Sequence, residues 1–280
     1  MNRVVLKEIA LRNDRFSGLA PKVRRVLFGL FLLQFALVWA RLWLPWPLLG
    51  NARWPDGLLV VLTTATLLAS LTRQLPGQNV MLASVIIAFL AGVFQTLGTL
   101  TAIPFGPYVY TDEIGQQLFH PLPWAVPLVW VAVILASRGV ARLMLRPWRK
   151  TQNYGFRLIG LTILLVVLLD VGLEPFATSV KHYWFWNPTK LKFDWYSTPC
   201  VNFLGWAVTA LLILAFATPS LINKKPMPQP PPDYSSLTVW LLMNLLFATG
   251  AAVHRLWPAV GVIILISVAA GVFAVRGARW

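Results

Sequence analysis

The chain has 280 residues, of which 58% are hydrophobic and 12% are charged, and its formal net charge is +15. A water-soluble domain of this length would not sustain that apolar fraction, and a β-barrel is disfavoured because the apolar residues run continuously instead of alternating. No basic module with interleaved aromatic residues is present, so the positive charge indicates membrane topology and contact with anionic lipid rather than nucleic-acid binding. We therefore expect an all-α fold, a polytopic bundle of transmembrane helices.

Apolar runs close to the roughly 20 residues that a bilayer-spanning helix needs recur along the whole chain. They predict about eight spans, or seven if one of the two short runs, the second and the seventh, does not cross the membrane. In chain order the runs are roughly Val26–Trp46, Pro55–Leu71, Asn79–Ile103, Pro123–Leu143, Phe156–Ser179, Pro199–Pro219, Ser236–Ala252 and Trp257–Val275.

The polar segments around these runs divide the chain into four parts. Residues 1–25 are predicted to form a basic cytoplasmic tail and not a secretory signal peptide, because the apolar run that follows is long and lacks a small-residue cleavage site. Residues 26–222 form a six-span core, residues 223–235 a stiff proline-rich connector of the polyproline type, and residues 236–280 a two-span hairpin with a short tail.

Basic residues are distributed unevenly between the loops on the two sides. With the N-terminus in the cytoplasm, 18 of the 24 lysines and arginines fall on the cytoplasmic side and 5 on the outer side, and Arg41 lies inside the first span. The positive-inside rule therefore predicts a multi-pass protein of the inner (plasma) membrane with both termini in the cytoplasm.

Two acids, Asp170 and Glu174, lie in the outer half of the fifth predicted span. Their four-residue spacing places both carboxyls on one helix face, and a charge at the bilayer centre costs about 2.5–3.5 kcal/mol. Since two carboxylates on one face repel each other, we expect one to stay protonated and so to serve as a proton donor. The alternative is that the two acids join helices by pairing with Arg41 or with a polar side chain.

The loop IPFGPYVYTDEIG carries a second pair of acids, Asp112 and Glu113, on the side of the membrane where Trp and Tyr are dense. An interfacial aromatic belt accounts for part of that density, and a turn capped at Thr111 and Asp112 is the structural alternative for the acids. No Cys or His spacing indicates a metal site and no glycine-rich phosphate loop is present, so we expect no metal and no cofactor. The single cysteine, Cys200, excludes an intrachain disulfide.

Several blocks of the sequence resemble the carotenoid-biosynthesis membrane family. The first is FQTLGTLTAIPFGPYVYTDEIG at Phe94–Gly115, followed by PLPWAVPLVW at Pro121–Trp130. The second comprises DVGLEPFAT at Asp170–Thr178, WFW at Trp184–Trp186 and YSTPCVNFLGW at Tyr196–Trp206. The loop PFGPYVYTD is the specific part of the match, and the resemblance covers roughly residues 94–206.

The resemblance implies hydration of a terminal carotenoid double bond, as in the bacterioruberin and myxol-type pathways. Protonating an acyclic end group leaves a tertiary cation that takes up water, which needs a carboxyl acid, a base and aromatic walls but no cofactor. The partners are then the carotenoid substrate, membrane lipid and other carotenoid-biosynthesis enzymes. The expected catalytic residues are Glu174, Asp170, Asp112 and Glu113. The expected substrate-binding residues are Gln95, Phe105, Tyr108, Tyr110, Trp184, Trp186, Asn202 and Trp206.

Two other functions remain open from the sequence. A proton- or cation-coupled transporter would use Asp170 and Glu174 as a relay, but the apolar run at Leu158–Leu169 argues against a path through the membrane. The other is a noncatalytic assembly partner of carotenoid enzymes, because the family's usual pattern has an acid where this chain has Gln95. The usual pattern also has a glycine where this chain has Ala102.

Overall fold

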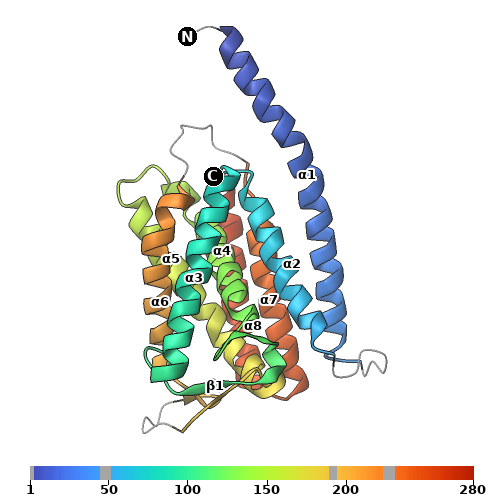
Figure 1. Cartoon of the computed structure of the whole chain (residues 1–280), viewed down its shortest axis with the longest axis vertical. Coiled ribbons are helices and arrows are strands. Elements are labelled where there is room, and N and C mark those ends of the chain that lie inside the picture. The colour runs from blue at the N-terminus through green and yellow to red at the C-terminus, as the bar shows by residue number, and fades with distance from the viewer. Residues whose placement is uncertain (1–2, 45–51, 189–193, 223–230) are drawn as a thin grey trace.

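The computed structural model describes residues 3–44, 52–188, 194–222 and 231–280, with the backbone alone described over residues 3–20. Eight helices in the described part are long and apolar enough to cross a membrane (Figure 1). They are α1 (Arg3–Ala40), α2 (Trp54–Leu71), α3 (Gly77–Thr101), α4 (Ala125–Met144), α5 (Tyr154–Pro175), α6 (Val201–Ala217), α7 (Ser235–Val253) and α8 (Trp257–Ala278). The expected all-α bundle is confirmed, and the protein is a multi-pass membrane protein.

Helix ends follow local backbone chemistry. Helices α2 and α8 each begin with a Trp-Pro pair, and proline suits the first turn because it lacks the N–H that would stay unpaired there. Helix α3 is capped by Ala102 at φ 61°, a left-handed conformation that glycine adopts without strain. Helix α1 starts at Arg3, well before the expected first span, and contains Pro21.

Helix α5 ends in an unusual way. It closes at Pro175, and the chain continues as a π-helical turn, η3 (Phe176–Val180). Proline removes a backbone donor and crowds the preceding turn, and π-turns in general accommodate such a disturbance of the hydrogen-bond ladder. Glu174 therefore lies where a regular helix gives way to a wider turn.

One end of the bundle is covered by short strands, and we call it the strand end; it lies at the bottom of Figure 1, away from both termini. Strand β1 (Tyr108–Tyr110) pairs antiparallel with β4 (Trp184–Trp186), β2 (Gln117–Phe119) with β3 (Leu122–Pro123), and β5 (Asp194–Trp195) with β6 (Thr198–Pro199). A 3-10 turn, η1 (Asp112–Ile114), follows β1. The pairing of β1 with β4 joins the two blocks that carry the family resemblance.

The opposite end of the bundle carries two further 3-10 turns, η2 (Arg146–Trp148) and η4 (Thr218–Leu221), next to the C-terminal ends of α4 and α6. We call it the arginine end, because Arg138, Arg142, Arg146 and Arg149 belong to it.

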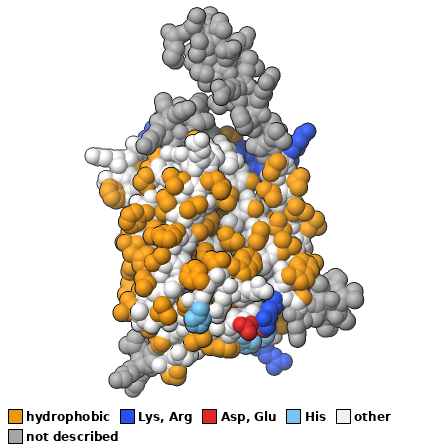
Figure 2. All heavy atoms as spheres, viewed as in Figure 1, with side chains coloured by type: hydrophobic (Ala, Val, Ile, Leu, Met, Phe, Trp, Pro, Cys, Tyr) orange, Lys and Arg blue, Asp and Glu red, His pale blue; other side chains and the backbone are white. Residues whose placement is uncertain are grey.

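Helix α4 forms the centre of the bundle. Of its span, 78% is buried, against 22% for the spans in α1 and α8, and it contacts α2, α3, α5, α7 and α8. Peripheral helices instead turn large apolar side chains outward, as Leu82 and Phe89 of α3 do. Figure 2 shows such apolar side chains over the flank of the molecule, the surface that suits a hydrocarbon environment.

The predicted orientation is testable because one span, α5, separates Lys150 from Asn187, and both residues are exposed. In a background with Cys200→Ser, we expect Asn187→Cys to react with a membrane-impermeant maleimide in intact cells. Lys150→Cys should react only after permeabilisation. Labelling of both sites from the same side would contradict the positive-inside assignment and the crossing of α5.

Candidate functional site

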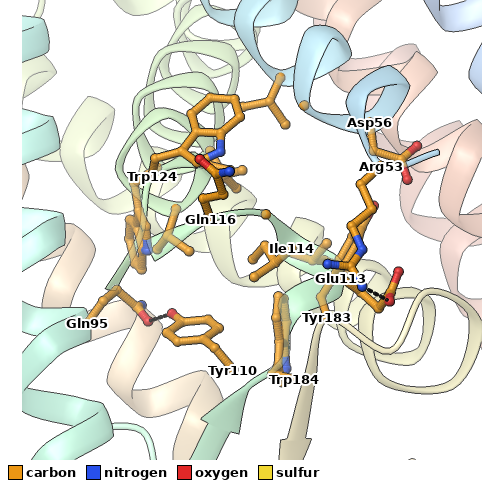
Figure 3. A pocket seen from close by; sticks show the side chains of 18 of the residues that line it. Arg53, Asp56, Gln95, Tyr110, Glu113, Ile114, Gln116, Trp124, Tyr183 and Trp184 are labelled. Atoms are coloured by element: carbon orange, nitrogen blue, oxygen red, sulfur yellow. Dashed lines mark hydrogen bonds and ion pairs between the residues drawn. The ribbon is translucent and has the colours of Figure 1, made fainter. Parts of the chain in front are cut away.

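A cavity of about 690 Å³ opens at the strand end (Figure 3). Its walls come from α2, α3, α4, α5 and α6, and from the loops that carry β1 and β4. The volume lies within the range of small-molecule sites, about 300–1,000 Å³. Ten of the twelve residues expected from the sequence line it: Gln95, Phe105, Tyr108, Tyr110, Glu113, Glu174, Trp184, Trp186, Asn202 and Trp206.

Glu174 is the carboxyl at the centre of the site, and only 1% of its surface is exposed. Its Oε2 accepts hydrogen bonds from Trp184 Nε1 (3.1 Å), Trp186 Nε1 (3.0 Å) and Thr198 Oγ1 (2.9 Å). Its Oε1 accepts one from Asn202 Nδ2 at 3.0 Å. The two tryptophans reach the same oxygen because they are two residues apart on β4 and so point to the same side of the strand.

Asp170 lies one turn deeper on α5 and is joined to Glu174 by a shared donor. Asn202 Nδ2 donates to Asp170 Oδ2 at 2.9 Å as well as to Glu174 Oε1. Asp170 Oδ1 is buried and has no hydrogen-bond partner among the described residues, and Asp170 is not part of the cavity lining. Glu174 is therefore the member of the pair that a molecule in the cavity would meet.

Gln95 of α3 holds two tyrosines of the cavity wall in place, next to the tryptophans of β4. Its Oε1 accepts hydrogen bonds from Tyr108 Oη at 2.8 Å and from Tyr110 Oη at 2.6 Å, the latter drawn in Figure 3. Both tyrosines sit on β1, two residues apart, and thus on one side of the strand. Burial raises the pKa of Tyr108 to about 12, so this phenol stays protonated and remains a donor at physiological pH.

Aromatic rings make up much of the remaining lining. Trp130 and Trp206 stack with centroids 4.2 Å apart and an interplanar angle of 18°. Trp186 packs against Tyr108 at 5.2 Å, and Trp184 meets Tyr110 edge to face at 6.2 Å. The cavity thus presents ring faces beside one buried carboxyl.

The second pair of acids separates in space although the two residues adjoin in sequence. Glu113 lines the cavity and forms an ion pair with Arg53 at 2.8 Å, with about half of each side chain exposed, as Figure 3 shows. Asp112 is exposed and lies outside the lining. The turn is capped by Thr111, whose Oγ1 accepts from the Glu113 amide at 3.2 Å. The structure therefore places Glu113 at the cavity mouth and Asp112 away from it.

The donors to Asp170 and Glu174 are all neutral groups in the described part of the chain. The sequence left open a pairing of these acids with Arg41. In the structure Arg41 Nη2 donates instead to the carbonyl oxygen of Ala52, at 3.1 Å. A polar side chain, Asn202, joins α6 to the acids of α5.

Residues outside the expected set also build the site. Thr198 completes the hydrogen bonding of Glu174, and Trp124 and Trp130 line the cavity. Thr198 and both tryptophans belong to the sequence blocks that carry the family resemblance, and this membership was the sequence feature that could have indicated them as site residues. What the sequence did not reveal is the direction in which each of these side chains points.

The fold and the cavity define a multi-pass membrane protein with a buried carboxyl in an aromatic site. Comparison with known proteins then identifies the family: the model of the carotenoid biosynthesis protein family matches residues 56–270, and the chain belongs to this family. The resemblance seen in the sequence is thereby confirmed.

A curated relative is a bisanhydrobacterioruberin hydratase of Haloarcula japonica. The two sequences are 24% identical over 123 residues, which cover 44% of this chain and 39% of the relative. The match therefore spans well under two thirds of the relative's length. No solved structure matches the chain.

The role of Thr198 can be tested by removing its hydroxyl without changing its shape. Thr198→Val should lower the free energy of unfolding by about 1–3 kcal/mol, because a buried acceptor loses a donor, and should lower the unfolding temperature in detergent. The matched control is Thr72→Val, since Thr72 is exposed and its hydroxyl donates to the backbone oxygen of Ala69 in α2, at 2.8 Å. Equal unfolding temperatures for the two variants would contradict the contribution of Thr198.

Proposed function

We propose that this protein hydrates the terminal double bond of an acyclic carotenoid end group by acid catalysis. The observation that carries the proposal is the placement of Glu174: a carboxyl with four neutral hydrogen-bond donors, facing an aromatic cavity. Membership of the carotenoid biosynthesis family and the name of the Haloarcula japonica relative support it.

In the proposed reaction, the protonated carboxyl of Glu174 transfers its proton to one carbon of the terminal double bond. The π electrons form the new C–H bond and leave a tertiary cation on the neighbouring carbon. Water adds to that cation through oxygen, and its excess proton passes to the Glu174 carboxylate. The site returns to its starting state, and the net change is addition of H and OH across the double bond.

The hydrogen bonds around Glu174 suit this sequence of steps. Negative charge develops on its carboxyl as the proton leaves, and donors already held in place by β4, Thr198 and Asn202 stabilise that charge without rearrangement. We assign Asp170 the role of a positioning residue, because it shares the Asn202 amide with Glu174 and lies behind the cavity wall.

The aromatic lining suits both the substrate and the intermediate. Ring faces attract a cation by about 2 kcal/mol or more when it is shielded from water, and Trp184, Trp186 and Tyr108 lie beside Glu174 in the lining. A long polyene need not fit inside the cavity. Leu58 and Val61 line the cavity and are also 38% and 39% exposed on α2, so the end group can enter from the lipid while the polyene stays outside.

We place Glu113 and Arg53 at the entrance for water, because both line the cavity and both are about half exposed. Asp112 was expected among the catalytic acids. In the proposed mechanism it has no step, because its side chain lies outside the cavity lining and is exposed.

Replacing the proposed acid is the direct test. Glu174→Gln keeps an acceptor for the tryptophans but cannot donate or accept the catalytic proton, so hydration should fall by about 10²–10⁴-fold or more. Asp170→Asn should reduce the rate by a smaller factor. The assay is conversion of an acyclic-ended carotenoid to its hydroxylated product by purified protein in ¹⁸O-labelled water, with the product oxygen read by mass spectrometry.

The matched control is Asp194→Asn, which removes an exposed acid of β5 that does not line the cavity and should leave the rate unchanged. Full activity of Glu174→Gln would remove Glu174 from the mechanism. Product oxygen derived from O₂ would reject hydration itself.

Gln95 provides a separate test, since the family's usual residue here is an acid. Gln95→Glu keeps an acceptor for Tyr108 and Tyr110 and should hydrate at a rate within about tenfold of the parent. Gln95→Leu leaves the Tyr110 hydroxyl without its acceptor, an expected loss of about 1–3 kcal/mol, whereas Tyr108 can still donate to the backbone oxygen of residue 95. The variant should lower both activity and unfolding temperature. The control Gln117→Leu changes an exposed residue of β2 outside the lining.

Three results would contradict this use of Gln95. Full activity of Gln95→Leu would show that catalysis does not require Gln95 to hold Tyr108 and Tyr110 in place. If the parent protein is inactive while Gln95→Glu is active, the result favours a noncatalytic role as an assembly partner. Inactivity of the parent and of both variants would favour the same role.

A further inference from the structure

A second cavity, of about 300 Å³, lies at the arginine end of the bundle, far from Glu174. Four arginines line it: Arg73, Arg138, Arg142 and Arg149. They converge there from the ends of α2 and α4 and from the turn after η2. A smaller adjoining cavity of about 70 Å³ shares Arg138, Arg142 and Arg149, so the positive charges face a common space.

Arg138 is the informative member of this set. It lies on the central helix α4, is only 6% exposed, and donates from Nη2 to the carbonyl oxygen of Leu221 at 2.8 Å. A buried guanidinium is unfavourable unless a counter-charge or several acceptors satisfy it. The positive-inside rule accounts for exposed arginines on one side of a membrane. It does not account for an arginine that is buried inside the bundle.

Carboxylates of the described residues do not neutralise this cluster. No ion pair forms within 4.0 Å between any of them and Arg138, Arg142 or Arg149. Asp233 is the described acid at this end, and its Oδ2 already engages Arg73 at 3.2 Å and Ser70 Oγ at 2.6 Å. Its Oδ1 accepts from the Ser235 amide at 3.0 Å. The cavity therefore carries a net positive charge.

The rest of the cavity lining combines polar and apolar side chains, and a lipid can contact both kinds whereas a free ion cannot. Thr218 Oγ1 is buried and has no hydrogen-bond partner among the described residues, and it lines the cavity together with the ring of Tyr154. The apolar part of the wall consists of Leu75, Leu158, Ile159, Leu214, Leu221 and Ile222. Such a wall offers nothing to inorganic phosphate but suits the glycerol and first acyl carbons of a phospholipid.

We propose that this cavity binds the phosphate headgroup of an anionic phospholipid. Arginines bind phosphate oxygens through paired, charge-assisted hydrogen bonds, and basic pockets between membrane helices are suited to anionic headgroups. Arg138 and Arg142 hold the phosphate from α4, Arg149 reaches it from the turn after η2, and the apolar wall takes the start of the acyl chain. The bound lipid supplies the counter-charge that the described carboxylates do not provide.

The test uses the full chain, purified in a neutral detergent and titrated with phosphatidylglycerol or with phosphatidylcholine. Phosphatidylglycerol should raise the unfolding temperature in a saturable way, because a ligand that binds only the folded state stabilises it, and phosphatidylcholine should raise it little. Native mass spectrometry should show one retained phosphatidylglycerol. In the double variant Arg142→Gln/Arg149→Gln, the apparent affinity for phosphatidylglycerol should fall about tenfold or more.

The matched control is Arg157→Gln/Arg279→Gln, which removes the same charge from exposed arginines that do not line the cavity, and its affinity should stay within about twofold of the parent. The single variant Arg149→Gln guards against misfolding, since Arg149 is exposed, and it should show an intermediate loss while its unfolding temperature without lipid matches that of the parent.

Three results would overturn the proposal. Equal losses in the two double variants would mean general charge attraction instead of a site. Equal stabilisation by inorganic phosphate would assign the site to a free anion and reject the lipid. Equal stabilisation by phosphatidylcholine would reject recognition of an anionic headgroup.

Discussion

A carboxyl buried inside an apolar helical bundle requires hydrogen-bond donors, and the strand end of this molecule is organised around that requirement. Glu174 receives donors from β4, from Thr198 beside β6 and from the first turn of α6. These segments lie 10 to 28 residues beyond Glu174 in sequence. They can meet the carboxyl only because the chain after α5 folds back over the end of the bundle. The strands cap the cavity and also satisfy its central polar group.

The fold-back begins at the end of α5. Pro175 closes the helix, and in the π-turn that follows the amide of Lys181 bonds to Phe176 O while that of Tyr183 bonds to Ala177 O. The next residue, Trp184, begins β4, which runs alongside β1. Because β1 holds Tyr108 and Tyr110 against Gln95 of α3, the pairing links the carboxyl of α5 to Gln95 through adjoining aromatic side chains. A shift of β4 along β1 by one residue would turn both tryptophans away from Glu174.

Hydropathy and spacing were sufficient to predict the eight apolar helices and the shared face of Asp170 and Glu174, since both depend on regular helix geometry and on nothing distant in sequence. The sequence could not predict which donors meet Glu174, because that depends on the pairing of β1 with β4 across some seventy residues. Adjacency was also a poor guide for Asp112 and Glu113. A single 3-10 turn directs one of them to Arg53 and the cavity mouth and the other to the exterior. The first part of α1, from Arg3 onward, was not predicted to be helical, because its sequence is basic and polar and lacks an apolar run.

The distribution of charge follows from the same requirement. The chain has 24 basic residues, yet the described groups that hydrogen-bond to Asp170 and Glu174 are indoles, a hydroxyl and an amide. A guanidinium in that position would favour the ionised carboxyl and so remove the proton that the proposed reaction needs. It would also repel the carbocation that the reaction forms. Neutral donors avoid both effects while still stabilising the carboxylate after proton transfer. The buried arginine lies instead at the far end of the bundle, on the central helix α4, where a phosphate can neutralise it without affecting the acid.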